Sequence, residues 1–286
     1  MISIIICSRS KDFLSQVESN VAATIGVPYE VLAIDNSVEG RGICEVYNLG
    51  AAQAKYELLC FMHEDILFQT QDWGATVVAA LQPPTVGVVG VAGGTYQARA
   101  PMGWGGANQL FGVNIIHTTE GTSQPEYLNP FGKNTMPAAT LDGVWLCCRK
   151  AVWSEFKFDA VAFPGFHFYD VDFSARVAKK YQNLVLFDVL IEHFSGGKFD
   201  KTWMQQALIF YKKRKDILPI ATLGNSQTEK HLLDLIAFQS FTVRAIAAGL
   251  PASTILFCLL RCFKASPINR DNFYLAKNFL QSSLRS

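Results

Sequence analysis

Residues 56–65, Tyr-Glu-Leu-Leu-Cys-Phe-Met-His-Glu-Asp, decide the fold. The apolar run Tyr56–Met62 is typical of a strand that is buried on both faces, as the strands of parallel sheets are. The run ends on three ionisable side chains, those of His63, Glu64 and Asp65. Ligands of open α/β sheets bind beyond the carboxyl ends of the strands. The stretch therefore predicts a central strand that leads polar groups into a ligand site.

Strands and helices alternate on either side of this stretch. The predicted strands share a short apolar run and cover residues 2–7, 29–34, 56–62, 86–91, 141–148 and 184–189. The predicted helices share helical periodicity and cover residues 17–25, 43–55, 73–81, 170–180 and 202–215. This alternation is typical of a mostly parallel sheet with helices on both faces. We therefore expect a Rossmann-like α/β domain over residues 1–215 and a helical extension over residues 216–286.

One long segment, Ala92–Ala139, shows weak periodicity and is rich in Gly, Asn, Thr and Pro. We expect irregular structure there, and long irregular segments of compact domains are usually functional or disordered. Its part Tyr96–Gly112 has the composition of a mobile loop, with Trp104 as an exposed anchor. The loop is predicted to close over a bound ligand, as mobile lids do.

The bulk composition excludes several classes of protein. The chain has 286 residues, half of them hydrophobic, and a net charge of +1, so no basic excess points to nucleic acid. Its seven cysteines show no CxxC spacing, and most lie in apolar runs, which favours a reducing, cytoplasmic setting. The start, MISIIICSRS, is predicted to be a strand and not a signal peptide.

The apolar segment Ala245–Leu260 could suggest a membrane span. Its 16 residues fall short of the roughly 20 that a spanning helix needs, and Gly249 and Pro251 interrupt it. We expect two buried or surface-docked helices. Peripheral contact of these C-terminal helices with the inner face of a membrane stays open as an alternative.

The strand-end cluster could bind a divalent cation. Mg²⁺ and Mn²⁺ take oxygen ligands, and Mn²⁺ also accepts imidazole. In extended geometry His63 and Asp65 would share one face, and Glu64 would point the other way. The alternative interpretation of the cluster is an acidic helix start before Ile66.

Three other polar positions follow predicted strands or begin a helix. Asp170 and Asp172 flank Val171 at a helix start, where one carboxylate could be a general base and the other a cap. Asp35 ends the second strand and could bind a ribose or a base, or merely cap a turn. His193 ends a later strand, before a glycine-rich turn that would let the backbone approach phosphate closely.

The order of these clusters resembles that of family 2 glycosyltransferases with the GT-A fold, over about residues 1–215. The motifs that carry the resemblance are ISIIICSR at 2–9, Ile34–Ser37, Asn48–Gly50, His63–Asp65, LDGVWLCCRKAVW at 141–153, Phe158-Asp159, Tyr169–Ser174 and His193. Within the family, the chain resembles a bacterial glycosyltransferase-like subfamily with His-x-Asp in place of the family's DxD motif. It departs from the family pattern at His63, which replaces Asp, and at Tyr169, which replaces Glu.

The resemblance implies an inverting hexosyltransferase that uses Mn²⁺ or Mg²⁺, a UDP-, GDP- or dTDP-sugar, and a glycan or lipid-linked acceptor. It implies that Asp170 is the catalytic base. The implied metal ligands are Asp65, His193 and His63. The implied nucleotide-binding residues are Ser8, Arg9, Asp35, Asn36, Asn48, His63 and Glu64. The implied acceptor-site residues are Trp104, Asp142 and Asp172, although Asp172 could instead pair with Arg176, its i+4 neighbour.

Two other functions have to be weighed. A nucleotidyltransferase shares the strand-end carboxylates, but usually carries a Gly-rich basic loop after the first strand, where this chain has Ser8–Asp12 and no glycine. A non-catalytic module that binds sugar nucleotides or glycans should have lost the base or the metal ligands. Asp65, Asp170 and His193 are all present, which favours an enzyme.

Overall fold

The computed structural model describes residues 1–106, 110–197 and 199–283. The chain forms two compact units, one of Met1–Thr95 with Leu110–Gly197 and one of Tyr96–Gln109 with Lys198–Ser286. The domain boundary expected at residue 215 stays a prediction.

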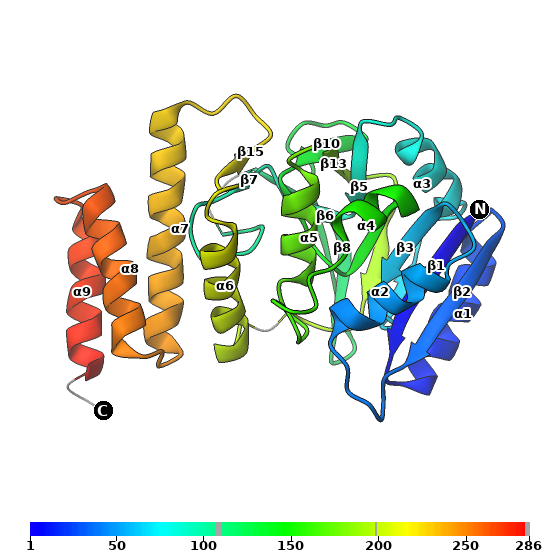
Figure 1. Cartoon of the computed structure of the whole chain (residues 1–286), viewed down its shortest axis with the longest axis horizontal. Coiled ribbons are helices and arrows are strands. Elements are labelled where there is room, and N and C mark those ends of the chain that lie inside the picture. Colours follow the sequence, from blue (N-terminus) through cyan, green and yellow to red (C-terminus); the bar gives the residue numbers. More distant parts are fainter. Residues whose placement is uncertain (107–109, 198, 284–286) are drawn as a thin grey trace. The chain divides into compact units, whose positions relative to one another are not determined.

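The first unit contains a seven-stranded sheet in the order β10-β13-β5-β12-β3-β1-β2 (Figure 1). Its strands are β1 (Ile2–Ser8), β2 (Tyr29–Asp35), β3 (Leu58–Met62), β5 (Val86–Gly90), β10 (Thr135–Ala138), β12 (Trp145–Arg149) and β13 (Gln182–Leu186). Pairing along the sheet gives β2, β1, β3, β5 and β13 one direction, and only β12 and β10 run against them. The expected mostly parallel sheet is confirmed.

Helices of this unit pack against its strands. They are α1 (Lys11–Thr24), α2 (Ile43–Gln53), α3 (Trp73–Leu81), α4 (Lys150–Phe156) and α5 (Tyr169–Val177). Helix α2 lies so close to β1 that a Cβ on Gly50 would sit 2.4 Å from the Ile5 side chain. Only glycine permits this approach. Gly50 of the Asn48–Gly50 motif is therefore required for the packing of α2 on the sheet.

A second sheet lies in the same unit and has the order β11-β6-β8-β14-β4, with β9 paired to β8. Its strands are β4 (Ile66–Phe68), β6 (Ala92–Gly94), β8 (Phe111–Thr119), β9 (Thr122–Leu128), β11 (Thr140–Leu141) and β14 (Ile191–His193). The expectation of irregular structure over Ala92–Ala139 is therefore wrong. The β8–β9 hairpin turns at Glu120-Gly121, both with positive φ, which is the backbone of a type I′ turn.

This second sheet determines where the metal-binding candidates meet. Strands β4 and β14 pair antiparallel with Ile66 opposite His193, so Asp65 lies beside the end of β14. The Phe194 amide donates to the Asp65 carbonyl at 3.0 Å. The alternative interpretation of Asp65 as a helix start is wrong, because Ile66–Phe68 is a strand.

The second unit is mainly helical. It contains α6 (Lys201–Arg214), α7 (Gln227–Ala247), α8 (Ala252–Ala265), α9 (Arg270–Ser283) and the two short paired strands β7 (Tyr96–Gln97) and β15 (Ile220–Ala221). Helices α7, α8 and α9 pack side by side (Figure 1). Gly249, with φ of 61°, and Pro251 separate α7 from α8, as expected. Within the described residues, every helix is too short or too polar to cross a membrane.

The first residues of the predicted lid segment Tyr96–Gly112 form strand β7, and hydrogen bonds hold them to the second unit. The buried Tyr96 hydroxyl bonds Asp234 at 2.9 Å, and the Arg99 side chain donates to the Leu218 carbonyl at 2.6 Å. Trp104 is half-buried and not fully exposed. Residues 107–109 of the segment lie outside the described residues, and closure over a ligand stays a prediction.

Candidate active site

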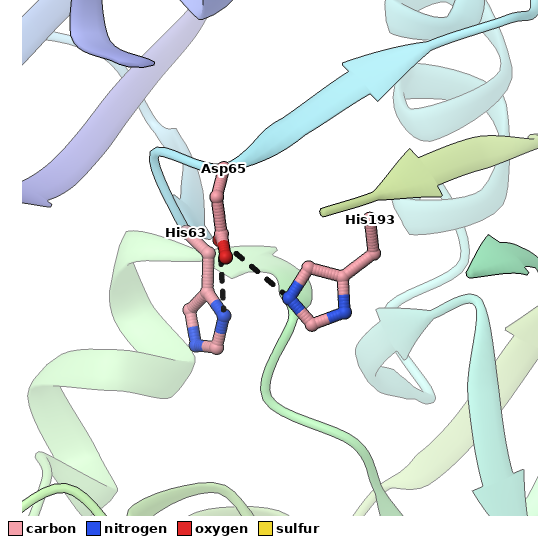
Figure 2. A group of neighbouring side chains, drawn as sticks. All are labelled: His63, Asp65 and His193. Atoms are coloured by element: carbon pink, nitrogen blue, oxygen red, sulfur yellow. Dashed lines mark ion pairs between the residues drawn. The ribbon is translucent and has the colours of Figure 1, made fainter. Parts of the chain in front are cut away.

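Two histidines and one carboxylate converge at the carboxyl end of β3 (Figure 2). Asp65 Oδ1 lies 3.9 Å from His63 Nδ1 and 3.5 Å from His193 Nε2. One ligand atom from each residue lies within 4.8 Å of the others. His63 and Asp65 share one face because they are two residues apart in extended backbone. These three side chains could hold one divalent cation and leave coordination positions open.

The charges in this cluster suit a cation. Burial, and then the neighbouring His193, lower the pKa of His63 to about 4, so its imidazole is neutral near pH 7. Burial alone would raise the pKa of Asp65, but a hydrogen bond from His193 and the nearby imidazoles together lower it to about 2. A neutral imidazole and an ionised carboxylate are the forms that bind metals.

Glu64 points away from the cluster, and its side chain forms hydrogen bonds that stabilise the turn between β1 and α1. Its carboxylate accepts from the Ser8 hydroxyl at 2.8 Å and from the backbone amides of Arg9 and Ser10. Its carboxylate and the Ser8 hydroxyl are thus both used within the protein. Glu64 can therefore hold Ser8 and Arg9, two of the predicted nucleotide-binding residues, in position without contacting a nucleotide itself.

A cavity of about 330 Å³ opens beside the cluster. His63 and Asp65 line it together with the guanidinium-bearing Arg9 and Arg41 and the aromatic Phe166. Its other lining residues are Cys7, Phe13, Asn36, Gly40, Gly42, Ile43, Tyr47, Glu64, Pro164, Gly165 and Ser195. The size falls in the range of small-molecule sites. The cavity thus has apolar walls and two arginine side chains next to the metal-binding cluster, which suits a nucleotide with a charged diphosphate.

The positively charged guanidinium group of Arg9 is available to a ligand. Arg41 pairs with Glu39 and lies 3.4 Å from Glu45. Among the side chains that the structure describes, none forms an ion pair with Arg9. Asn36 also lines the cavity, but its amide braces the loop through two hydrogen bonds to the Arg41 backbone.

Asp170 lies at the start of α5 with Asp142 as its charged neighbour. Burial, and then the Asp142 charge, raise the pKa of Asp170 to about 7. The Gly143 amide donates to Asp170 Oδ2 at 2.8 Å, which fixes the carboxyl group. A carboxylate with a pKa near the working pH is well suited to general base catalysis.

Asp172 has a different role. It is fully buried, and its Oδ2 accepts from Arg176 Nε at 2.8 Å, so the pairing considered from the sequence is confirmed. Arg176 also donates to the carbonyls of Phe156 and Lys157, which joins α5 to the end of α4. A side chain without exposed surface is not placed to touch an acceptor, so the structure favours a stabilising role over the acceptor role.

The Asp172→Asn variant is expected to be destabilised by about 2–3 kcal/mol, because Arg176 loses a charged hydrogen-bond partner and is only partly exposed. Chemical denaturation monitored by tryptophan fluorescence measures this loss. Asp216→Asn, a change in the second unit, is the matched control. Equal stability of the two variants would contradict the role of the pair.

Eight predicted site residues do not line the cavity, namely Ser8, Asp35, Asn48, Trp104, Asp142, Asp170, Asp172 and His193. Asp35 is exposed at the end of β2 and accepts from the amide and the hydroxyl of Ser37. The Asn48 amide bonds Trp153 and both backbone groups of Phe158, so it braces the chain after α4. Trp104 belongs to the second unit.

The structure adds one contact that the sequence argument missed. The Tyr169 hydroxyl lies 2.8 Å from His63 Nε2 and donates to the Gly143 carbonyl at 2.9 Å. Tyr169 stood out in the sequence only as a departure from the family pattern. Because Tyr169 and His63 are 106 residues apart in the sequence, no local pattern indicated their contact.

A family model described as glycosyltransferase-like family matches residues 3–216. None of the curated proteins compared with this chain matches it. Solved structures do match. TarS residues 1–349 of S. aureus in complex with UDP has a TM-score of 0.58 at 12% identity, covering 98% of this chain and 88% of that one.

Two further structures match at similar levels. The mannosyltransferase PcManGT of Pyrobaculum calidifontis, in complex with GDP-Man and Mn²⁺, has a TM-score of 0.51 at 14% identity, covering 99% of this chain and 86% of that one. GalNAc-T7 with UDP, GalNAc and Mn²⁺ has a TM-score of 0.50 at 9% identity, covering 91% of this chain but only 54% of that one. At these identities the likeness concerns the fold, and it confirms the predicted GT-A fold. Since the family model spans most of its residues, the chain belongs to the glycosyltransferase-like family.

Proposed function

We propose that this protein is a divalent-metal-dependent, inverting glycosyltransferase that moves a sugar from a nucleoside diphosphate sugar to an acceptor hydroxyl. The observation that carries the proposal is the convergence of His63, Asp65 and His193 beside a nucleotide-sized cavity that also presents Arg9. Two structural neighbours, GalNAc-T7 with UDP, GalNAc and Mn²⁺ and PcManGT with GDP-Man and Mn²⁺, combine a nucleotide or nucleotide sugar with Mn²⁺, which supports the same pairing here.

The donor set fits a transition metal better than Mg²⁺. Mg²⁺ prefers oxygen ligands, whereas imidazole nitrogens suit transition metals, and Mn²⁺ accepts imidazole together with oxygen ligands. His63 and His193 would each supply one nitrogen and Asp65 one oxygen. The cation, when bound, neutralises the charge that develops on the departing diphosphate.

The protein's own residues would supply binding and proton transfer. Arg9 would contact a phosphate, because its guanidinium lines the cavity, has no ion-pair partner among the described side chains and matches phosphate geometry. Asp170 would take the proton from the acceptor hydroxyl as that oxygen attacks the anomeric carbon. Attack opposite the leaving diphosphate inverts the anomeric configuration, and the role proposed for Asp170 is the one general base that such a transfer needs.

The direct test is a hydrolysis and transfer screen with UDP-, GDP- and dTDP-sugars, with Mn²⁺, with Mg²⁺ and with chelator. We expect one donor class to be consumed, faster with Mn²⁺ than with Mg²⁺, and not with chelator. Anomeric configuration of the product, read by proton NMR, tests inversion. Tight nucleotide binding without consumption of any donor would instead favour a binding module, and release of pyrophosphate from a nucleoside triphosphate would favour a nucleotidyltransferase.

Asp35 is proposed to hold the nucleoside and not the metal. Asp35→Ala is expected to weaken binding of the nucleoside diphosphate by a similar factor, about 10-fold, with and without Mn²⁺, since one hydrogen bond to a charged group contributes about 1.5 kcal/mol. Titration calorimetry at matched nucleotide concentrations measures both constants. A loss confined to the samples with Mn²⁺ would place Asp35 at the metal instead.

The predicted acceptor is a glycan or a lipid-linked molecule, and the face of α8 and α9 supports a membrane-associated one. Leu256, Leu260 and Lys264 follow one another at i, i+4 and i+8 on α8, and Phe273 and Lys277 do so on α9. The rings of Phe263 on α8 and Phe273 on α9 lie 5.2 Å apart, so the two helices are in contact beside these rows. The three leucine and phenylalanine side chains Leu256, Leu260 and Phe273 are exposed. Apolar side chains with interspersed lysines are typical of helices that bind anionic lipid surfaces.

We expect the full chain to sediment with vesicles of phosphatidylcholine and phosphatidylglycerol more than with vesicles of phosphatidylcholine alone. Leu260→Gln combined with Phe273→Gln should abolish sedimentation, whereas Val78→Gln, an exposed position on α3, should not. Absence of vesicle binding, together with a dimer in gel filtration that the double variant disperses, would show that the face binds a second copy of the chain.

A further inference from the structure

The hydroxyl group of Tyr169 forms a short chain of contacts with the site. It lies 2.8 Å from His63 Nε2 and 2.9 Å from the Gly143 carbonyl oxygen. A carbonyl oxygen can only accept a hydrogen bond, and a tyrosine hydroxyl has one proton to give. Both contacts are satisfied only if the hydroxyl donates to Gly143 and accepts from a protonated His63 Nε2. The network therefore assigns the His63 tautomer.

This tautomer leaves the other ring nitrogen with its lone pair free. That nitrogen, Nδ1, is the atom that faces Asp65 Oδ1 at 3.9 Å (Figure 2). Metal-binding histidines commonly donate their second ring N–H to a supporting acceptor, which fixes tautomer and ring orientation. Tyr169 provides such an acceptor here, and it comes from α5, an element far from β3 in the sequence.

The surroundings hold the hydroxyl in place. Tyr169 is buried, and its ring packs edge-on against Tyr47 with centroids 5.8 Å apart. A Cβ at Gly143 would lie 2.2 Å from the Tyr169 hydroxyl oxygen, so only glycine leaves room for it. The same Gly143 contributes its amide to Asp170. One residue thus anchors both the support of His63 and the proposed base.

We propose that Tyr169 is a positioning residue for the metal centre: its hydroxyl holds His63 in the Nε2–H tautomer and directs Nδ1 toward the cation. Tyr169 itself contacts neither the cation nor the sugar in this proposal. The inference rests on the proposed metal site, and the two can fail separately. If wild-type protein binds no Mn²⁺, the metal site is wrong. If it binds Mn²⁺ and the loss of the hydroxyl changes nothing, only the role of Tyr169 is wrong.

The first test needs no metal. Nitrogen-15 NMR of the metal-free full chain with labelled histidine, assigned with a His63→Gln variant, should show His63 protonated on Nε2 at pH 7. In Tyr169→Phe, which keeps the ring and removes the hydroxyl, His63 should populate both tautomers. A wild-type His63 protonated on Nδ1 would overturn the proposal.

The second test measures Mn²⁺ affinity in the presence of UDP by electron paramagnetic resonance. Tyr169→Phe is expected to bind Mn²⁺ about 10–100-fold more weakly, the usual cost of removing a group that supports a metal ligand. The control Tyr211→Phe removes another buried hydroxyl, one that accepts from Arg261 in the second unit. It should keep wild-type Mn²⁺ affinity even if it loses comparable thermal stability.

A double-mutant cycle separates positioning from general destabilisation. In a His63→Ala background the hydroxyl has no ring to orient, so Tyr169→Phe should cost no further Mn²⁺ affinity. Additive losses in the two variants would show that Tyr169 acts independently of His63, and would overturn the proposal.

Discussion

Asp170→Asn is expected to lower the turnover of sugar transfer by about 10²–10⁴-fold, the usual loss when a general base is removed. Asparagine keeps the size of the side chain and can keep the hydrogen bond from the Gly143 amide. What it loses is the ability to accept the acceptor's proton. Donor affinity should change little, because the base acts on the acceptor and not on the nucleotide.

The pH dependence provides an independent signature of this base. The carboxyl group must be ionised to act, and burial with the Asp142 charge raises its pKa to about 7. Turnover should therefore rise as the pH increases through about 7 and fall below it. Asp142→Asn removes the neighbouring negative charge, so it should move the midpoint of this rise to lower pH.

The matched control for Asp170→Asn is Asp172→Asn, two residues along the same helix. That carboxylate pairs with Arg176, so its loss should reduce stability while turnover per folded molecule stays near that of the wild type. Near-normal transfer by Asp170→Asn with a true acceptor would contradict the proposed mechanism, and Asp142 would then be the next base to test.

The sequence was sufficient for six strands of the main sheet because they are local apolar runs, but it missed β10, which lies in the segment expected to be irregular. Ile2–Ser8 and Leu58–Met62 are buried almost throughout, and such runs identify strands of parallel sheets without further context. The position of His63 and Asp65 on one face also followed from strand geometry alone.

The second sheet was harder to predict, because its strands are short or carry little hydrophobic periodicity. Strand β9 (Thr122–Leu128) is exposed along its whole length, and β6 (Ala92–Gly94) is mostly glycine. Strand β9 pairs with β8, and β6 pairs with both β8 and β11, and these pairings are not visible in the local sequence. The Glu120-Gly121 turn was a local signal for the hairpin, since Gly at positive φ suits a two-residue turn.

The contacts of the site are the part that sequence reasoning could not reach. His193 was found only as a polar residue at a strand end, and its proximity to Asp65 depends on the pairing of β14 with β4. Tyr169 and Gly143 meet His63 and Asp170 through packing of α5 against the strands. Long-range contacts of this kind depend on tertiary structure, so motif spacing alone does not give them.

Asp65→Asn is expected to remove the metal-dependent part of nucleoside diphosphate binding. Asp65 supplies the negative charge of the three-residue cluster, and its carboxylate lies between the two imidazoles. Asparagine is nearly the same size but neutral, so two nitrogen ligands and an amide oxygen would remain. Loss of a supporting group typically lowers metal affinity by about 10–100-fold, and loss of the only charged ligand should cost at least ~100-fold.

The measurement is titration of the wild type and of Asp65→Asn with UDP and GDP, each with and without Mn²⁺. The variant should bind the metal-free nucleotide about as well as the wild type, or slightly better, because a negative charge near the diphosphate is gone. The increase in affinity that Mn²⁺ gives the wild type should disappear. Asp35→Ala is the contrasting variant, since it should weaken binding under both conditions and keep the Mn²⁺ increment.

An undiminished Mn²⁺ increment in Asp65→Asn would contradict the assignment of Asp65 as a metal ligand. The cation would then have to be held without this carboxylate.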